Sequence, residues 1–292
     1  MVSFGLDVSH YQGHINWEKV ADAGKTFVII KAQYESGTHK KDEFFEANYN
    51  GSGEHGLNRG VYIYIGSNSA ADPERDALSL LKHLNHRELE SGIWLDCEDP
   101  KLKSYGKAKW TKLINQYASI FQAAGYYVGI YCSRDWYCHV LDYKTLAQNY
   151  EFWIARYPKI DTGIYSPASI LTPQKYACAW QYSSKGRVNG IVGNVDLNVD
   201  FDGITDLSAK HVREGVADTK NPYREPTGLV RLGTRGNTVK WVQWMLNRVG
   251  YVLPVNGIAD ELTIGAVMDF QKKNDLTIDG IVGKKTVAKL KM

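Results

Sequence analysis

Two acidic side chains, Asp96 and Glu98, end an apolar run that begins at Ile93 and stops at Pro100. Alternate side chains of an extended strand share a face, so both acids point to the same side as Trp94. Their backbones would lie about 7 Å apart. Paired carboxyl groups near that spacing serve acid–base chemistry at a glycosidic bond. The alternative is a strand end whose acids only meet water or cap the next segment.

Further polar and aromatic residues occur where other apolar runs end. Asp7 alternates with Leu6 and Val8 in the first run, and Asp196 lies near the start of the last one. Carboxyl groups gathered at one opening repel each other, so their assembly is better explained by a functional site than by a structural device. The acids that we expect there are Asp7, Asp96, Glu98 and Asp196, and the other site candidates are Lys31, Tyr62, Tyr64, Trp180 and Gln181.

Eight short β-rich runs must position these side chains: residues 4–9, 27–33, 60–66, 92–97, 126–132, 152–157, 177–182 and 195–201. Helix-like stretches separate the first six, at residues 15–23, 42–55, 73–84, 107–124 and 134–148. After the sixth run the helical period disappears and prolines and glycines increase. The sequence therefore predicts an α/β fold, a (β/α)5(β)3 TIM-like barrel with five β/α units followed by three strands.

A glycine-rich loop at residues 183–194 links the last two runs. A loop of this kind fits a hairpin better than a helical crossover, so the eighth strand is predicted to run antiparallel to the seventh. The chemistry of such barrels lies at the carboxyl ends of the parallel strands. The start of the eighth strand, with Asp196, would lie at that same opening.

The tail contains an internal echo. Asn-Gly-Ile at 256–258, followed by Thr263, recurs as Asp-Gly-Ile at 279–281, followed by Thr286. A helix-like run with a glutamine precedes each copy, so this region is predicted to be a small, mostly helical domain with glycine turns before its helices. The predicted organisation is a catalytic barrel at 1–205, a polar linker at 206–228 and the helical domain at 229–292.

Composition limits the partners. The net charge of +3 is too small to indicate nucleic acid, but residues 229–292 carry 10 Lys and Arg against 5 Asp and Glu. This surplus is compatible both with a polyanionic surface as a partner and with a solvated basic face. No run approaches the ~20 apolar residues of a membrane span, so no membrane insertion is expected. No His or Cys set has metal-site spacing, so no metal or other cofactor is predicted.

Four motifs resemble those of glycoside hydrolase family 25 lysozymes, in matching order over residues 1 to about 205. They are Gly-Leu-Asp-Val-Ser-His-Tyr-Gln-Gly at 5–13 with Asn16-Trp17, Trp-Leu-Asp-Cys-Glu at 94–98, Trp-Gln-Tyr at 180–182 and Val-Asp-Leu-Asn at 195–198. The tail is similar to the peptidoglycan-binding-type-1 domain, for example in Asp-Gly-Ile-Val-Gly at 279–283. Cys97 is a departure, because the family usually has a small apolar residue there; it should face outward.

The resemblance implies an N-acetylmuramidase that hydrolyses the β-1,4 bond between N-acetylmuramic acid and N-acetylglucosamine in peptidoglycan glycan strands. A lysozyme joined to a wall-binding module resembles a phage or prophage endolysin. The first residues lack a basic segment followed by a long apolar one, so we expect synthesis in the cytoplasm without a signal peptide. The enzyme would then reach the wall through a holin-type or lysis-dependent release. The sequence carries no indication of an oligomeric state.

The resemblance also implies roles for the site residues. Glu98 would protonate the leaving oxygen, and the neighbouring Asp96 and Asp7 would favour its acid form by like-charge repulsion. Asp96 would either attack the anomeric carbon or orient the substrate's N-acetyl group, and the strand spacing favours the second route. Asp7 and Asp196 would hold hydroxyl groups or water, or stabilise positive charge. Tyr62, Tyr64 and Trp180 would stack on sugars, and Lys31 would pair with Asp7 or Asp96.

Some of these residues have structural alternatives. Lys31 could be an ion-pair partner, Tyr62 and Tyr64 could fill the barrel, and His10 is expected to be a packed, hydrogen-bonded histidine rather than a base. Two other functions were weighed. A non-catalytic glycan-binding barrel would be indicated by the loss of Glu98, which is present. A peptidoglycan amidase or peptidase would need a zinc set or a Cys–His pair.

Overall fold

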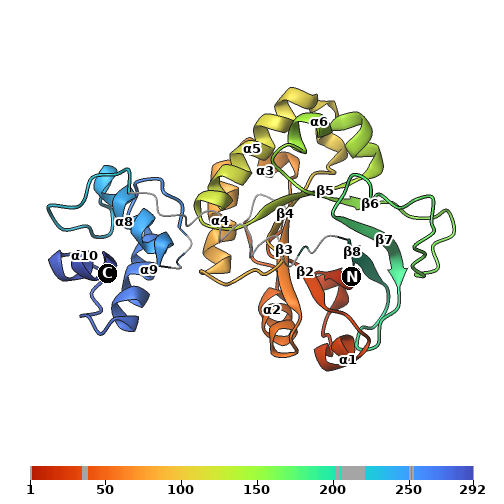
Figure 1. The fold of residues 1–292 in the computed structure, drawn as a ribbon, viewed down its shortest axis with the longest axis horizontal. Coiled ribbons are helices and arrows are strands. Elements are labelled where there is room, and N and C mark those ends of the chain that lie inside the picture. The colour runs from red at the N-terminus through yellow and green to blue at the C-terminus, as the bar shows by residue number, and fades with distance from the viewer. Residues whose placement is uncertain are drawn as a thin grey trace.

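A computed structural model describes residues 2–34, 39–201, 204, 221–249, 251 and 253–291. Eight strands close into a barrel in sequential order (Figure 1). They are β1 Ser3–Val8, β2 Phe27–Lys31, β3 Asn58–Tyr64, β4 Ile93–Asp96, β5 Val128–Ser133, β6 Phe152–Ala155, β7 Ala179–Gly186 and β8 Val195–Asp200. Neighbours from β1 to β7 are parallel, whereas β8 is antiparallel to both β7 and β1. The predicted fold class and the reversed last strand are both confirmed.

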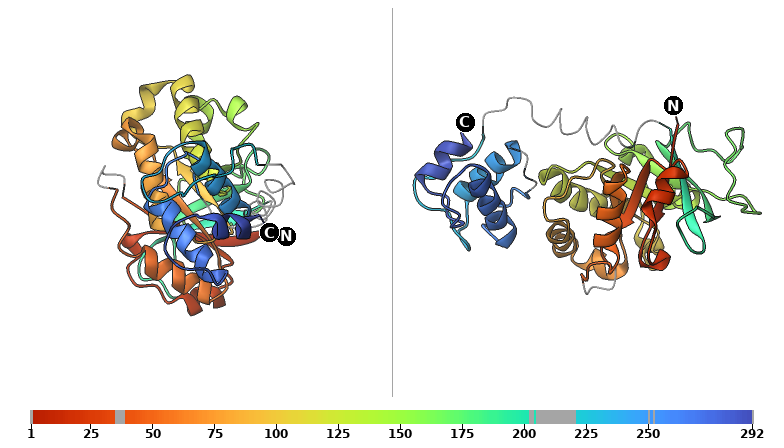
Figure 2. Two further views of the ribbon diagram at one scale, coloured as in Figure 1. Left: turned by 90° about the vertical axis from the view of Figure 1, so that its left-hand side faces the viewer. Right: turned by 90° about the horizontal axis from the view of Figure 1, so that it is seen from below.

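Helices surround the first strands on the outside of the barrel (Figures 1 and 2). They are α1 Trp17–Asp22, α2 Phe45–Glu54, α3 Ser67–Ala71, α4 Pro73–Leu84, α5 Lys107–Ala123 and α6 Tyr143–Leu146. The start of α4 follows local chemistry: the Asp72 side chain accepts a hydrogen bond from the Arg75 backbone N–H at 3.2 Å, and Pro73 occupies the first turn, where its missing N–H costs nothing.

The helix predicted over residues 134–148 is interrupted. A π-helical turn, η3, covers Trp136–Val140 and is followed by the short α6. Between them Leu141 is extended, with ψ of 151°. The Asp142 carboxylate then accepts the Thr145 hydroxyl at 2.8 Å, a local bond that favours a new helix start over continuation of the old helix.

Strand alternation separates two apolar layers. The barrel interior includes Phe27, Ile29, Trp94, Tyr131 and Trp153, and a larger cluster lies between the strands and the helices. Gly129 makes room for the Trp94 indole, because a Cβ at that position would lie 2.4 Å from the ring. Cys97 is in the outer layer, as expected. The interior is therefore packed with aromatic rings below the carboxyl ends of the strands.

The C-terminal helices α8 Asn237–Arg248, α9 Glu261–Lys273 and α10 Lys284–Leu290 enclose a second, smaller core. Figure 1 and the right-hand view of Figure 2 show this unit beside the barrel. Asn247 donates its side-chain N–H to the Ala123 carbonyl at 2.9 Å, and Lys82 pairs with Glu261 at 3.4 Å. Of the predicted linker, residues 206–220 lie outside the described residues. No helix in the described part combines the length and apolar character that a membrane span needs.

Candidate active site

Four carboxyl groups converge where the parallel strands end. Asp7 in β1 lies opposite Asp196 in the register between β1 and β8. Asp96 is the last residue of β4, and Glu98 follows it by two positions. The Tyr131 hydroxyl lies among these acids: burial raises its pKa most, and the negative charges of nearby carboxylates, those of Glu98, Asp96 and Asp7 among them, raise it further. The predicted acidic cluster is therefore brought together at one mouth.

Asp7 is almost buried, with 9% of its surface exposed, and its Oδ2 accepts two amide N–H groups. Gln181 donates at 2.8 Å and Asn198 at 2.7 Å. Burial raises the pKa of Asp7, and these hydrogen bonds oppose that rise because they stabilise the ionised carboxylate. The site thus holds a desolvated carboxylate in a fixed orientation.

Asp196 shares a hydrogen bond with Asp7. Burial, followed by the negative charge of Asp7 and this hydrogen bond, raises the pKa of Asp196 to about 8. Asp7 already accepts from two amide donors, so the proton of the pair belongs on Asp196. Within this pair, Asp7 is therefore the better place for the negative charge and Asp196 the better place for the proton.

The orientation of the Gln181 amide is set from the other end. Its Oε1 accepts the Tyr131 hydroxyl at 2.8 Å and the hydroxyl of Tyr157 as well. With two hydroxyl donors on its oxygen, its NH₂ group must face Asp7. Gln181 is only 2% exposed, which corrects its predicted role as a substrate contact: it is a positioning residue for Asp7.

Glu98 is half-buried and leans toward β5. Its Oε1 accepts the backbone N–H of Ser133 at 2.5 Å. An oxygen that accepts this bond is the poorer place for a proton, so the acid form of Glu98 carries its hydrogen on Oε2. The adjacent Asp99 caps the next turn: it accepts the backbone N–H groups of Lys101 and Ser67 at 3.0 and 2.8 Å.

Three predicted substrate contacts lie at the mouth. The Lys31 ammonium is 5.6 Å from the centre of the Tyr34 ring, in a side chain that is 9% exposed. Tyr62 lies next to Lys31 in the strand register, and Tyr64 next to Asp96. Burial first, and then the charges of the surrounding carboxylates, raise the pKa of Tyr62 well above its usual value, so its phenol remains a hydrogen-bond donor.

Trp180 does not reach the mouth, which corrects its predicted role as a stacking platform. It is 2% exposed and lies in the layer outside the barrel, where its ring contacts Tyr165 and Tyr182. Its indole N–H donates to the Arg156 carbonyl at 2.8 Å. The physical reason is strand alternation: since Gln181 faces inward, its neighbour must face outward.

Four contributors were missing from the sequence prediction: Asn198, Tyr131, Tyr157 and the backbone N–H of Ser133. Asn198 shares a face with Asp196, so the same alternation could have found it. Its Oδ1 accepts the indole N–H of Trp153 at 3.0 Å, which directs its NH₂ group to Asp7. Tyr157 and the backbone N–H of Ser133 lie beyond or at the ends of strands, where no periodicity indicates orientation.

A barrel mouth with a hydrogen-bonded pair of acids, a separate glutamic acid and phenolic donors is typical of a glycoside hydrolase. The model of glycosyl hydrolases family 25 matches residues 6–191, and the chain belongs to this family. A putative peptidoglycan binding domain matches residues 235–290. The protein is thus a lysozyme-family barrel joined to a peptidoglycan-binding module.

Three known proteins show the extent of this similarity. Lysozyme M1 of Streptomyces globisporus is 30% identical over 204 residues, which are 66% of each chain. The autolytic lysozyme of Clostridium acetobutylicum is 26% identical over 286 residues, which cover 97% of this chain and 76% of that protein. The catalytic domain of endolysin ply40 from bacteriophage P40 of Listeria monocytogenes has 27% identity and a TM-score of 0.54, covering 71% of this chain and 97% of that one.

Proposed function

We propose that this protein is an N-acetylmuramidase that hydrolyses the β-1,4 bond between N-acetylmuramic acid and N-acetylglucosamine in peptidoglycan, with its C-terminal domain holding it on the wall. The observation that carries the proposal is the arrangement of Asp96 and Glu98 at one mouth, with Glu98 held through one oxygen by the Ser133 N–H. The relatives named as lysozymes support the same reaction.

In the proposed reaction, Glu98 gives its proton to the glycosidic oxygen as the bond to the anomeric carbon breaks, and the leaving sugar departs as an alcohol. The acetamido oxygen of the substrate bonds to the anomeric carbon while Asp96 accepts the acetamido N–H. Water then attacks that carbon and displaces the acetamido oxygen. The Glu98 carboxylate takes the proton from this water, so the acid is regenerated.

Asp7 and Asp196 contribute electrostatics in this proposal. The ionised Asp7, fixed by two amide donors, favours the positive charge that develops on the sugar ring. Asp196 carries its proton as a donor within the site. The phenols of Tyr62 and Tyr131 remain neutral donors, because the surrounding carboxylates and burial oppose their ionisation.

The test is digestion of purified peptidoglycan, borohydride reduction of new sugar ends and mass spectrometry. Reduced muramic acid ends are expected. Reduced glucosamine ends would assign a glucosaminidase instead, and free peptides without new sugar ends an amidase or peptidase.

The acid is tested by Glu98→Gln, which keeps the shape and removes the proton donor. The rate should fall on the order of a hundred- to ten-thousand-fold, while sedimentation with cell walls is unchanged. Glu54→Gln, at the exposed end of α2, is the matched control and should keep full activity. A Glu98→Gln variant that cleared walls at the wild-type rate would refute this role for Glu98.

We also propose an endolysin-type use of the enzyme, in which it is made in the cytoplasm and reaches the wall when the membrane is opened. The pairing of a lysozyme-family barrel with a wall-binding module supports this proposal. Expression in a bacterial host should lyse cells only when a membrane-permeabilising protein is produced as well. Lysis by the enzyme alone would contradict it.

A further inference from the structure

Four side chains form a ladder that leads from the barrel mouth to the surface: Lys31, Tyr34, His10 and Tyr11. The Lys31 ammonium lies 5.6 Å from the centre of the Tyr34 ring. The His10 ring follows, with its centre 4.9 Å from that of Tyr34, and the Tyr11 ring is 4.1 Å beyond His10. Tyr11 is 82% exposed, so the outermost ring of this ladder is open to solvent.

His10 is held by a buried acid. Asp42, which is 2% exposed, accepts the backbone N–H of His10 at 3.3 Å and contacts its ring Nδ1 at 2.9 Å. The backbone of Tyr11 is fixed as well, because its N–H donates to the Ser9 hydroxyl at 3.2 Å. Gln12 donates to the Asn194 carbonyl at 3.4 Å and ties this turn to the loop before β8.

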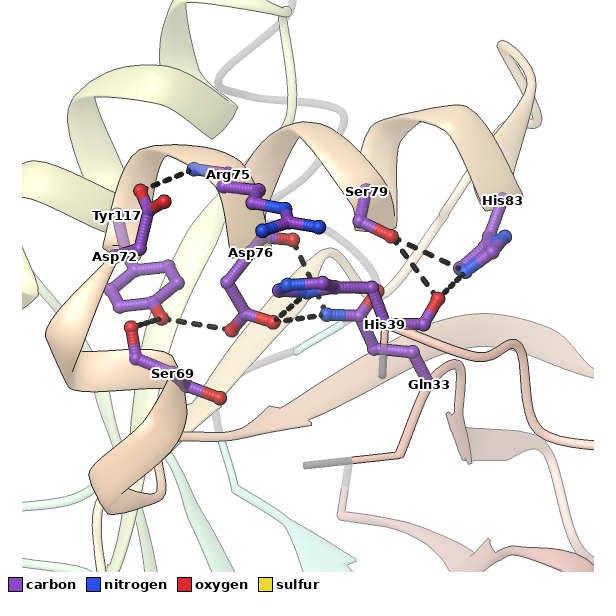
Figure 3. A network of polar contacts seen from close by, with 9 residues as sticks. All are labelled: Gln33, His39, Ser69, Asp72, Arg75, Asp76, Ser79, His83 and Tyr117. Carbon is purple, nitrogen blue, oxygen red and sulfur yellow. Dashed lines mark hydrogen bonds and ion pairs between the residues drawn. The ribbon is translucent and has the colours of Figure 1, made fainter. Parts of the chain in front are cut away.

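Gln33, the chain neighbour of Tyr34, and His39 are both anchored to α4 (Figure 3). Gln33 donates to the Asp76 carboxylate at 2.7 Å, and His39 contacts the same oxygen at 3.0 Å. The Tyr117 hydroxyl donates to the other Asp76 oxygen at 2.8 Å. Asp76 is 1% exposed. Buried polar groups thus hold the supports of the ladder in place before any ligand binds.

Resting on the proposed function, we propose that this ladder is an outlying subsite on which a sugar ring of the glycan strand stacks, beyond the bond that is cleaved. An exposed aromatic face that is already immobilised binds with little ordering cost. The ladder is continuous with the mouth through Lys31, so one extended chain can occupy both. Its single open ring is too small for a protein interface but matches the apolar face of a pyranose.

The experiment compares the hydrolysis of long glycan strands with that of the shortest peptide-free oligosaccharide that the wild type cleaves. For Tyr11→Ala, the ratio of kcat/KM on long strands to kcat/KM on the short substrate should fall about fivefold, the scale of one aromatic contact. The loss should lie in KM rather than kcat. Tyr11→Phe retains the ring and should restore most of the ratio, and Ile170→Ala, a side chain 91% exposed on another loop, should leave it unchanged.

His10→Ala removes the ring that packs against Tyr11. It should lower the same ratio, because the Tyr11 ring loses this support. An unchanged ratio in Tyr11→Ala would overturn the subsite, even though the wild type releases muramic acid ends. An equal loss on both substrates, or a loss confined to kcat, would overturn it too. Failure of the wild type to create any new sugar ends would instead overturn the proposed function, so the two failures are distinct.

Discussion

The C-terminal domain and the barrel mouth both bury side-chain amides, but the partners of these amides differ. Gln243 is fully buried, and its NH₂ group donates to Asn256 Oδ1 at 2.9 Å and to the Ile258 carbonyl at 3.0 Å. It also reaches the Thr263 hydroxyl at 3.1 Å, while its oxygen accepts the Gly257 N–H at 2.9 Å. One side-chain amide therefore supplies hydrogen-bond partners for the polar groups of the whole glycine turn.

The second copy of the predicted echo repeats this pattern. Gln271 donates to Asp279 Oδ1 at 2.9 Å and to the Ile281 carbonyl at 3.0 Å, and its oxygen accepts the Gly280 N–H at 3.0 Å. The Thr286 hydroxyl lies 3.4 Å from its NH₂ group. The repeat in the sequence is thus a repeated structural device in which a helix glutamine organises the following glycine turn.

At the barrel mouth the amides of Gln181 and Asn198 instead hold the Asp7 carboxylate beside a second carboxyl group. The C-terminal glutamines satisfy backbone groups that would otherwise be unpaired, so they contribute to stability at any pH. The mouth instead crowds carboxyl groups together, which costs stability and points to a chemical role. The comparison teaches that a buried amide is architectural or functional according to what it orients.

The largest effect is expected from Gln271→Ala. It leaves the N–H groups of Asp279 and Gly280 without their buried acceptor, so the local stability of the C-terminal domain should fall by about 3 kcal/mol. Amide hydrogen exchange on the full-length protein should show faster exchange in α9 and α10, with the barrel strands unaffected. Lys272→Ala, an exposed neighbour, is the control. Unchanged exchange would mean that the glutamine does not organise the turn.

A smaller, pH-dependent loss is expected from Asn198→Ala, about 2 kcal/mol at pH 8. The substitution removes one donor from Asp7 and the acceptor of the Trp153 indole, but Gln181 still donates to Asp7. Because the pKa of Asp7 is raised and Asn198 stabilises its ionised form, the loss should shrink as Asp7 gains its proton in more acidic solution. Urea unfolding at several pH values measures it. A pH-independent loss would assign Asn198 to packing alone.

Strand alternation carried most of what the sequence could predict. It placed Asp7, Asp96 and Glu98 at one mouth, and the glycine-rich loop predicted the reversed β8 that adds Asp196. Residues 180 and 181 are adjacent in a strand and cannot both face the mouth. The same alternation therefore excludes Trp180 from the site once Gln181 faces inward.

The features that the sequence did not predict depend on contacts between residues far apart in the chain, or on backbone geometry, which no local sequence pattern indicates. The Tyr157 hydroxyl and the Ser133 N–H meet their partners only after the barrel closes, because they belong to different strands or to the segments that follow them. The break between η3 and α6 depends on the extended backbone of Leu141, which apolar periodicity does not signal. The internal echo, by contrast, could be predicted from the sequence, because the residues of each copy that contact one another are close together in the chain.

A gain in stability, rather than a loss, is expected from Asp196→Asn, which is the sharpest test of the comparison. The folded-state pKa of Asp196 is raised to about 8, whereas an unfolded aspartic acid has a pKa near 3.9, so the folded protein binds more protons across that range. The stabilisation that Asp196 gives the folded wild-type protein is therefore fully present below about pH 4. It is lost as the pH rises through about 8. Asparagine stays neutral and keeps an N–H donor for Asp7.

The melting temperature of Asp196→Asn should therefore equal that of the wild type near pH 4 and exceed it near pH 9, while hydrolysis of peptidoglycan is slowed. Differential scanning calorimetry and the reducing-end assay on the same preparation measure both. Asp161→Asn is the control acid, because its carboxylate is satisfied by Ser183 and Ser184 and its pKa is lowered. It should lose stability at pH 9 rather than gain it. If Asp196→Asn were less stable than the wild type at pH 9, the carboxyl pair would be a structural element and the contrast between the two regions would fail.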